Sequence, residues 1–199
     1  MSKKGTPAVF RVGAFSTNFD TFSPITIIRQ FFVSTVCKNI SYIKDNHVEF
    51  EHVLEDSTEI HTNFIAISNL EKTYNVCSCA DCFIIFVDLE LKESMDKLEQ
   101  IVNYIKLKCN EDKKVYVLGI YTKVDNIQSS FKEETFKDYL DTTKLYYEYL
   151  EVCLEVTVEL VKIFEKIIQD AIEAKKELKI LQSGVNEDMS GSGANCVIF

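Results

Sequence analysis

Two short apolar runs constrain the fold of this chain more than any other feature of its sequence. They lie in Cys82–Val87 and in Lys114–Ile120, and the first of them contains no charged residue. Runs of this kind are typical of strands in a parallel sheet that is covered on both faces. The stretch between them, Ser94–Lys108, repeats apolar residues at the spacing of one helical face. The sequence therefore predicts βαβ units and an α/β fold with a mostly parallel sheet.

The remaining elements are predicted from the same patterns. We expect further strands at Ala8–Val12, which Gly13 would end, and at Tyr147–Cys153, a hairpin of Ile40–Lys44 and Val48–Leu54, and helices over Ile25–Phe32, Phe131–Tyr139 and Val158–Ile180. Between Asp56 and Asn75 we expect a loop and a short helix. The prediction is a sheet of about six strands with one antiparallel edge strand and helices on both faces.

Composition limits the class of function. The 199 residues carry a net charge of −9, which argues against a nucleic-acid partner, because a nucleic-acid binder needs a basic face. No run of about 18 apolar residues suggests a membrane span, and residues 1–7 lead directly into a strand pattern, so we expect no cleaved leader. Residues 1–182 form one predicted domain, and residues 183–199, rich in Ser and Gly, form a predicted flexible tail.

Two clusters of reactive side chains have ordinary explanations. Cys77, Cys79 and Cys82 have a spacing that could begin a zinc site, but no second pair of ligands follows, so we favour reduced thiols, packed or exposed. A Cys–His enzyme would use His47, His52 or His61. No nucleophile motif stands near these histidines, and surface positions explain them better.

The first group that suggests a ligand directly follows the strand Lys114–Ile120. In Thr122-Lys123-Val124-Asp125, a carboxylate can accept two N–H donors from a guanine edge, and the lysine stem can lie against the base. Adenine presents the opposite pattern of donors and acceptors there. The simpler alternative is a solvated turn of charged residues.

The order of these segments resembles the Ras superfamily of small GTPases, and is most similar to its Rab and Ras branches. Residues 122–125 fall at the Asn/Thr-Lys-x-Asp motif of that family, and Glu151–Glu155 falls at its Glu-Thr-Ser-Ala-Lys motif, with Cys153 and Leu154 in place of Ser-Ala. The resemblance implies a small G domain of the P-loop NTPase kind, GTP or GDP with Mg²⁺ as ligands, and effector or regulator proteins as partners.

The phosphate-binding motif of that family is degenerate in this sequence. Gly13 matches the first glycine of Gly-x-x-x-x-Gly-Lys-Ser/Thr, but Asn18, Phe19 and Asp20 replace the second glycine, the lysine and the hydroxyl that holds magnesium. A shifted register makes Ser23 the magnesium ligand, yet no lysine precedes it. In either register the loop lacks its cation, which argues against tight phosphate binding.

The two switch motifs are also altered. Asp56-Ser57-Thr58-Glu59 resembles Asp-x-x-Gly with glutamate at the glycine position, and Ile60 stands where the family has a glutamine that orients water. Thr35 resembles the threonine that reaches magnesium, although a plain entry to a strand, which needs no ligand, explains it slightly better. The resemblance therefore implies Asp56 and Thr35 as weak magnesium ligands and no efficient hydrolysis.

The chain ends in Cys196-Val197-Ile198-Phe199, the layout of a prenylation box, in which a terminal Phe favours a geranylgeranyl group. A single prenyl chain gives reversible attachment to a membrane. The tail has no polybasic run, since Lys175, Lys176 and Lys179 lie further back, where a solvated helix face explains them. We expect a protein of the cytoplasm and of the cytosolic faces of membranes.

The sequence thus favours a prenylated Rab/Ras-like protein of vesicle traffic or signalling with weak or absent GTP hydrolysis. One alternative is a divergent small GTPase that still binds GTP and cycles. Another is an α/β binding module unrelated to GTPases, with its ligand at the carboxyl ends of the strands.

Overall fold

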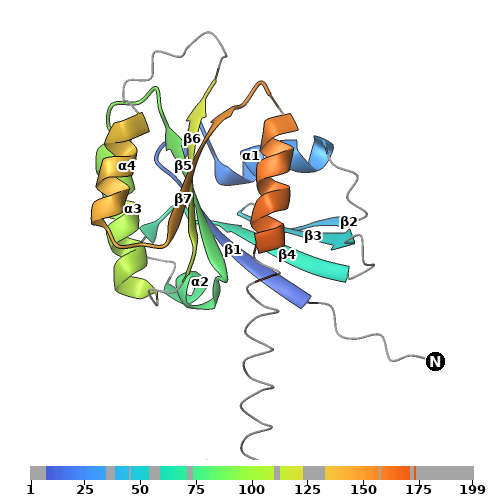
Figure 1. Ribbon diagram of the computed structural model, residues 1–199. Helices are drawn as coiled ribbons and strands as arrows, with labels where there is room; N and C mark the ends of the chain where they lie inside the picture. Colours follow the sequence, from blue (N-terminus) through green and yellow to red (C-terminus); the bar gives the residue numbers. More distant parts are fainter. Residues whose placement is uncertain are drawn as a thin grey trace, which may run out of the picture.

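The computed structural model describes residues 8–34, 39–44, 46–53, 59–70, 74–109, 113–122, 133–156, 158–170 and 173. Its sheet has seven strands in the order β2-β3-β4-β1-β5-β6-β7 (Figure 1). The strands are β1 (Ala8–Ser16), β2 (Asn39–Lys44), β3 (His47–Val53), β4 (Glu59–Ala66), β5 (Cys82–Asp88), β6 (Val115–Tyr121) and β7 (Tyr147–Cys153). The α/β class and the mostly parallel sheet are confirmed.

The expected number and order of strands need a correction. Five strands are parallel, from β4 through β1, β5 and β6 to β7, and β3 runs antiparallel beside β4. The six expected strands correspond to β1, β2, β3, β5, β6 and β7, and the seventh, β4, was not expected. Since β2 pairs antiparallel with β3 outside it, the antiparallel strand β3 is one place in from the edge.

The helices cover both faces of the sheet, as expected. They are α1 (Pro24–Ser34), α2 (Tyr74–Cys79), α3 (Ser94–Lys108), α4 (Glu133–Thr142) and a further helix over residues 158–170. Side chains of α1 and of the 158–170 helix build the core on one face, and those of α2, α3 and α4 build the core on the other (Figure 1). Because Cys82–Val87 lies between these two layers, it is buried along its whole length.

Two predicted boundaries are wrong, and both concern the centre of the sheet. Gly13 does not end β1, which continues to Ser16. The segment between Asp56 and Asn75 is not a loop with a short helix, because it contains β4, which pairs in parallel with β1 along seven residues. Its inward side chains, among them Thr62 and Phe64, are fully buried.

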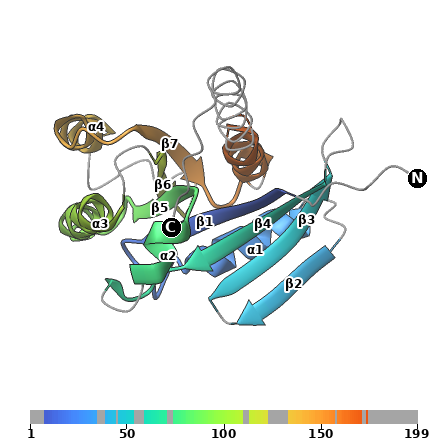
Figure 2. The same cartoon turned by 90° about the horizontal axis from the view of Figure 1, so that it is seen from below.

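Figure 2 shows the β2–β3–β4 part of the sheet face-on, with no described helix in front of it. Antiparallel strands commonly present one polar face to water in this way. His47 lies 3.7 Å from Glu49 and 3.3 Å from Asn63, and His61 lies 3.8 Å from Glu51. These partners are carboxylates and an amide, as expected for histidines on a sheet surface.

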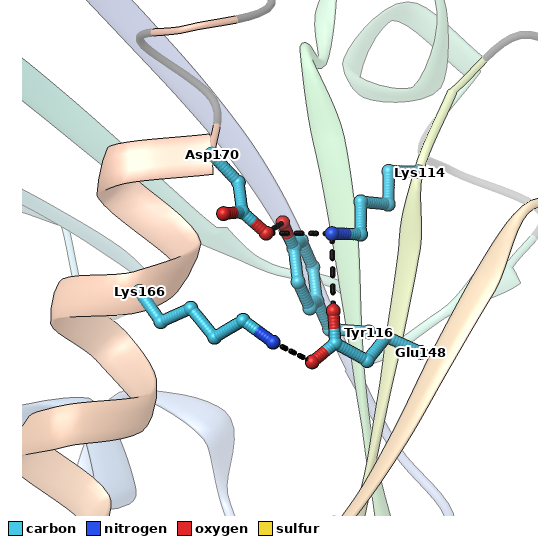
Figure 3. Close-up of polar contacts among 5 residues, drawn as sticks. All are labelled: Lys114, Tyr116, Glu148, Lys166 and Asp170. Carbon is cyan, nitrogen blue, oxygen red and sulfur yellow. Dashed lines mark hydrogen bonds and ion pairs between the residues drawn. The ribbon is translucent and has the colours of Figure 1, made fainter.

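A polar cluster fastens the 158–170 helix to the sheet at the amino ends of β6 and β7 (Figure 3). Lys114 Nζ lies 2.6 Å from Asp170 Oδ2 and 3.0 Å from Glu148 Oε2. Tyr116 donates its hydroxyl to Asp170 at 2.9 Å, and Lys166 pairs with the other oxygen of Glu148. We call these five residues the Lys114 clamp.

The Lys114 clamp shifts the titration of its carboxylates. Burial alone would raise the pKa of Asp170, but hydrogen bonds from Lys114 and Tyr116 outweigh it and hold the pKa below its ordinary value of 3.8. For Glu148, burial is likewise outweighed by hydrogen bonds from Lys166 and Lys114, and the pKa lies below its ordinary value of 4.5. The clamp therefore favours the charged forms of both groups.

Replacing Lys114 by Met should lower the free energy of unfolding by about 2 kcal/mol, because two partly buried carboxylates lose a shared cation. Lys162→Met, on an exposed position of the same 158–170 helix, is the matched control and should change it by less than about 0.5 kcal/mol. Urea denaturation measures both variants. Equal effects would show that the clamp contributes nothing beyond a surface lysine.

The clamp also predicts a dependence on pH. A carboxylate whose pKa is lowered in the folded state contributes stability that is fully present above its ordinary pKa and is lost as the pH falls through the folded value. The difference in unfolding free energy between the unaltered protein and Lys114→Met should hold near neutral pH and shrink below the ordinary values of 3.8 and 4.5. A difference that grows in acid would contradict this assignment.

Candidate functional site

The carboxyl ends of β1, β5, β6 and β7 meet at one edge of the sheet. In α/β folds with parallel strands, this edge is where ligands bind. The segments that follow these strands begin with Thr17, Leu89, Thr122 and Leu154. The candidate functional site is therefore built from the loop after β1 and from the ends of β5, β6 and β7.

The loop between β1 and α1 spans residues 17–23. Proline opens α1 at position 24, and the carbonyl of Ser23 accepts hydrogen bonds from the N–H groups of Thr26 and Ile27 at 3.0 and 3.2 Å. In the strand–loop–helix geometry of a phosphate loop, the lysine and hydroxyl stand where the helix begins. In this protein Phe22, Ser23 and Pro24 lie where the helix begins. The bounds of β1 and α1 therefore favour the register in which Ser23 is the magnesium ligand over the register that places the motif at residues 18–20.

Several N–H groups of the loop after β1 donate hydrogen bonds to other atoms of the protein. Thr17 donates to the carbonyl of Phe86 at 2.9 Å, Asn18 donates to Ser16 Oγ at 3.1 Å, and Phe22 donates to the carbonyl of Asn18 at 2.7 Å. Among the described residues, the only non-glycine residue with a positive φ angle is Lys144, and the described glycines have none. The loop therefore lacks the alternating backbone that turns successive N–H groups toward an anion.

A buried carboxylate lies against the loop from the end of β5. Asp88 is 5% exposed, and its two oxygens accept hydrogen bonds from Asn18 Nδ2 at 2.8 Å and from the N–H of Glu90 at 2.9 Å. No lysine or arginine among the described residues pairs with it. The donors around Asp88 are of the kind that stabilises an anion. The anion that they stabilise is the carboxylate of Asp88 itself.

Two buried hydroxyls extend this network to α3. The N–H of Asp88 donates to Thr17 Oγ1 at 2.9 Å, and Thr17 Oγ1 lies 3.0 Å from Ser94 Oγ at the start of α3. Thr17 and Ser94 are both almost completely buried. We call Thr17, Asn18, Asp88 and Ser94, with the N–H of Glu90, the Asp88 network.

Thr122 and Leu154, two of the residues expected to contact guanine, lie next to each other. Tyr121 pairs with Cys153 in the β6–β7 register, so Thr122 and Leu154 follow neighbouring strand ends. Their polar groups already have protein partners, however. Thr122 donates its hydroxyl and its N–H to Glu90 Oε1 at 2.9 and 3.2 Å, and Leu154 donates its N–H to the carbonyl of Tyr121 at 3.1 Å.

The other described residues that the resemblance assigned to the site either pack in the core or lie at the surface. A Cβ atom on Gly13 would lie 2.8 Å from a ring carbon of Phe83, so this glycine leaves room for the Phe83 ring over the middle of β1. Phe19 packs against the core on the α1 face, and Asp20 is exposed. Cys153 is buried in β7.

The Asp-x-x-Gly interpretation meets a topological difficulty. Glu59 is the first residue of β4, and β4 is parallel to β1, so Glu59 lies at the edge of the sheet opposite the loop of residues 17–23. The carboxyl end of β4 leads into Ile67, Ser68 and Asn69 instead. The other residues assigned from the sequence, Thr35, Asp56, Lys123, Asp125 and Cys196, lie outside the described residues.

The sequence did not assign Asp88, Glu90 or Ser94 to the site. A signal for Asp88 was present, since a carboxylate directly after a fully buried strand must lie at the ligand edge of the sheet. Asn18 contacts Asp88, which lies 70 positions away, and Thr122 contacts Glu90, which lies 32 positions away. The sequence around these residues does not indicate either contact.

Two of the three clustered cysteines belong to the core. Cys77 and Cys82 are buried and Cys79 is exposed. Burial raises the pKa of the Cys77 thiol and, most of all, that of Cys82. Within the part of the chain that the structure describes, no group of three His, Cys, Asp or Glu side chains is placed to hold a metal ion.

Comparison with known proteins leaves the family open. No protein-family model matches the chain, and no curated protein matches its sequence. The class that the fold and the site define is an α/β protein in which the loop after β1 is hydrogen-bonded to a carboxylate at the end of β5.

Asp88→Asn should lower the free energy of unfolding by about 1–3 kcal/mol, because an amide NH₂ would then face one of the two donors that the carboxylate accepts. Hydrogen exchange at the backbone N–H groups of Asn18 and Glu90 should become faster in the same variant. Asp138→Asn, on an exposed position of α4, is the control and should leave both unchanged. Unaltered exchange in Asp88→Asn would remove this carboxylate from its role in holding the loop.

Proposed function

We propose that this protein is a small-GTPase-like protein of the Rab/Ras kind that attaches to cytosolic membrane faces through a prenyl group on Cys196. In this proposal it recruits partner proteins in vesicle traffic or signalling and has no nucleotide cycle. The observation that carries the proposal is the Asp88 network, in which the loop after β1 is closed on a carboxylate of the protein.

Electrostatics support the absence of a nucleotide cycle. A phosphate at the end of β1 would approach the charges of Asp88 and Glu90 and would meet no lysine from the loop. Two like unit charges about 4 Å apart repel each other by about 4 kcal/mol at an effective dielectric constant of 20. Such a charge arrangement weakens binding of a polyphosphate by orders of magnitude unless Mg²⁺ and fixed N–H groups compensate.

The membrane part of the proposal rests on the last four residues. Cys196-Val197-Ile198-Phe199 has the layout that prenyl transferases modify. Within the described residues, no helix is both long and apolar enough to cross a bilayer. The proposed attachment is therefore a lipid anchor of the reversible, single-chain kind.

A second candidate is a divergent small GTPase that binds guanine nucleotides and cycles. The observation in its favour is the placement of Thr122 beside Leu154 at adjacent strand ends, where a guanine pocket would be built. In that case Glu90 would have to release Thr122 when the base enters.

Binding of a fluorescent guanine nucleotide to the full chain separates the two candidates. With magnesium or with a chelator, we expect no binding tighter than about 100 µM, because the loop offers no cation and its backbone does not turn successive N–H groups toward an anion. Tight magnesium-dependent binding that Asp125→Ala weakens would establish the second candidate instead.

The anchor is tested in eukaryotic cells by membrane fractionation. Cys196→Ser should move the protein from the membrane fraction to the soluble fraction. Cys79→Ser, which alters an exposed cysteine of the folded domain, is the matched control and should leave the distribution unchanged. Membrane attachment that persists in Cys196→Ser would contradict the prenyl anchor.

A further inference from the structure

A small pocket lies beside the Asp88 network, between the loop after β1, the end of β4 and α3. Its volume is about 260 Å³. Phe15, Ile67 and Ile101 contribute to its lining, and each of these side chains is at most 5% exposed. The pocket therefore has an apolar floor that belongs to the core on the α3 face.

The volume decides which kind of occupant fits. Pockets for small ligands and cofactors usually measure about 300–1,000 Å³, so this one is too small for a nucleotide. One large apolar side chain fills a space of this size. Protein interfaces commonly place one such anchor side chain in a pocket near their centre.

The rim of the pocket carries polar groups that are free to bind. Asp20 comes from the loop, and Lys97 and Gln100 come from α3. No hydrogen bond or ion pair engages these three side chains among the described residues. Lys97 and Gln100 can donate to backbone carbonyls of a partner, and Asp20 can accept from a cationic side chain.

The charge around the pocket favours a cationic partner. Asp20 and Lys97 place one charge of each sign on the rim, the Asp88 carboxylate is hydrogen-bonded to Asn18 in the pocket wall, and the whole chain carries a net charge of −9. Complementary charge speeds encounter and selects partners.

We propose that this pocket is the docking site of the recruited partner, and that it takes an aromatic side chain that is followed by a basic residue. The inference rests on the proposed function, which requires a partner surface that works without a nucleotide. The aromatic ring would lie on Phe15, Ile67 and Ile101, and the basic residue would pair with Asp20.

Three capped dipeptides test the chemistry on the isotope-labelled full chain. N-acetyl-Phe-Arg-amide should cause saturable NMR shifts at Ser68, Gln100 and Ile101 at millimolar concentration. N-acetyl-Phe-Glu-amide should bind roughly fivefold more weakly, because the attraction to Asp20 and to the net negative charge becomes a repulsion that Lys97 offsets only in part. N-acetyl-Ala-Arg-amide should cause no saturable shift, since it lacks the anchor.

Variants of the chain test the location. Ser68→Trp places a large side chain at an exposed position of the pocket wall and should abolish the shifts, and Asp20→Asn should remove most of the preference for Arg over Glu. Asp138→Asn, on the exposed surface of α4, is the matched control and should preserve that preference.

The possible outcomes separate this inference from the proposed function. Unchanged binding in Ser68→Trp, absent binding of all dipeptides, or equal binding of the Arg and Glu forms would overturn the docking site. None of these results bears on nucleotide binding or on the anchor at Cys196. Tight GTP binding together with dipeptide binding would overturn the proposed function and leave the pocket standing.

Discussion

The burial of the Asp88 carboxylate is the constraint that shapes the candidate functional site. A charge that is 5% exposed and has no cationic partner within the described part of the chain needs strong hydrogen-bond donors, or its burial would be costly. The Asn18 amide and the N–H of Glu90 supply them. Since Asn18 belongs to the loop after β1, stabilising the carboxylate also holds this loop in one conformation.

The same constraint explains why glycine is absent from that loop. A loop that binds phosphate must turn its N–H groups outward, which favours glycine with positive φ angles. Here Asn18 receives a hydrogen bond from the N–H of Thr21 on its side chain and one from the N–H of Phe22 on its carbonyl. A side chain at this position is required for the closed loop.

Much of the fold could be predicted because burial on both faces leaves a clear pattern. Cys82–Val87 and Ser94–Lys108 show their burial directly in the sequence, and the structure confirms both. The strand β4 was missed because its inward positions include Thr62, a polar residue that is fully buried and has no hydrogen-bond partner at Oγ1. Its period-two alternation was the signal, and the buried threonine obscured it.

The candidate site was predictable only where it follows from strand ends. Parallel strands share an edge, so the neighbourhood of Thr122 and Leu154 follows from sequence order. The direction in which a side chain points does not follow from the order of the strands along the sequence. Whether Asn18 faces a ligand or Asp88, and whether Glu90 faces solvent or Thr122, depends on residues distant in the chain.

The Asp88 network and the pocket beside it share a wall, and this links the closed loop to the proposed recruitment. Thr17 and Asn18 belong to the network, and both also line the pocket. In a protein that cycles between nucleotide states, a loop at this edge changes shape with its ligand, and a surface built on it changes too. Here a carboxylate of the protein is hydrogen-bonded to the loop, and the pocket is already formed in this structure. A preformed site binds with a smaller loss of conformational entropy. The feature that argues against nucleotide binding therefore also favours constitutive recruitment.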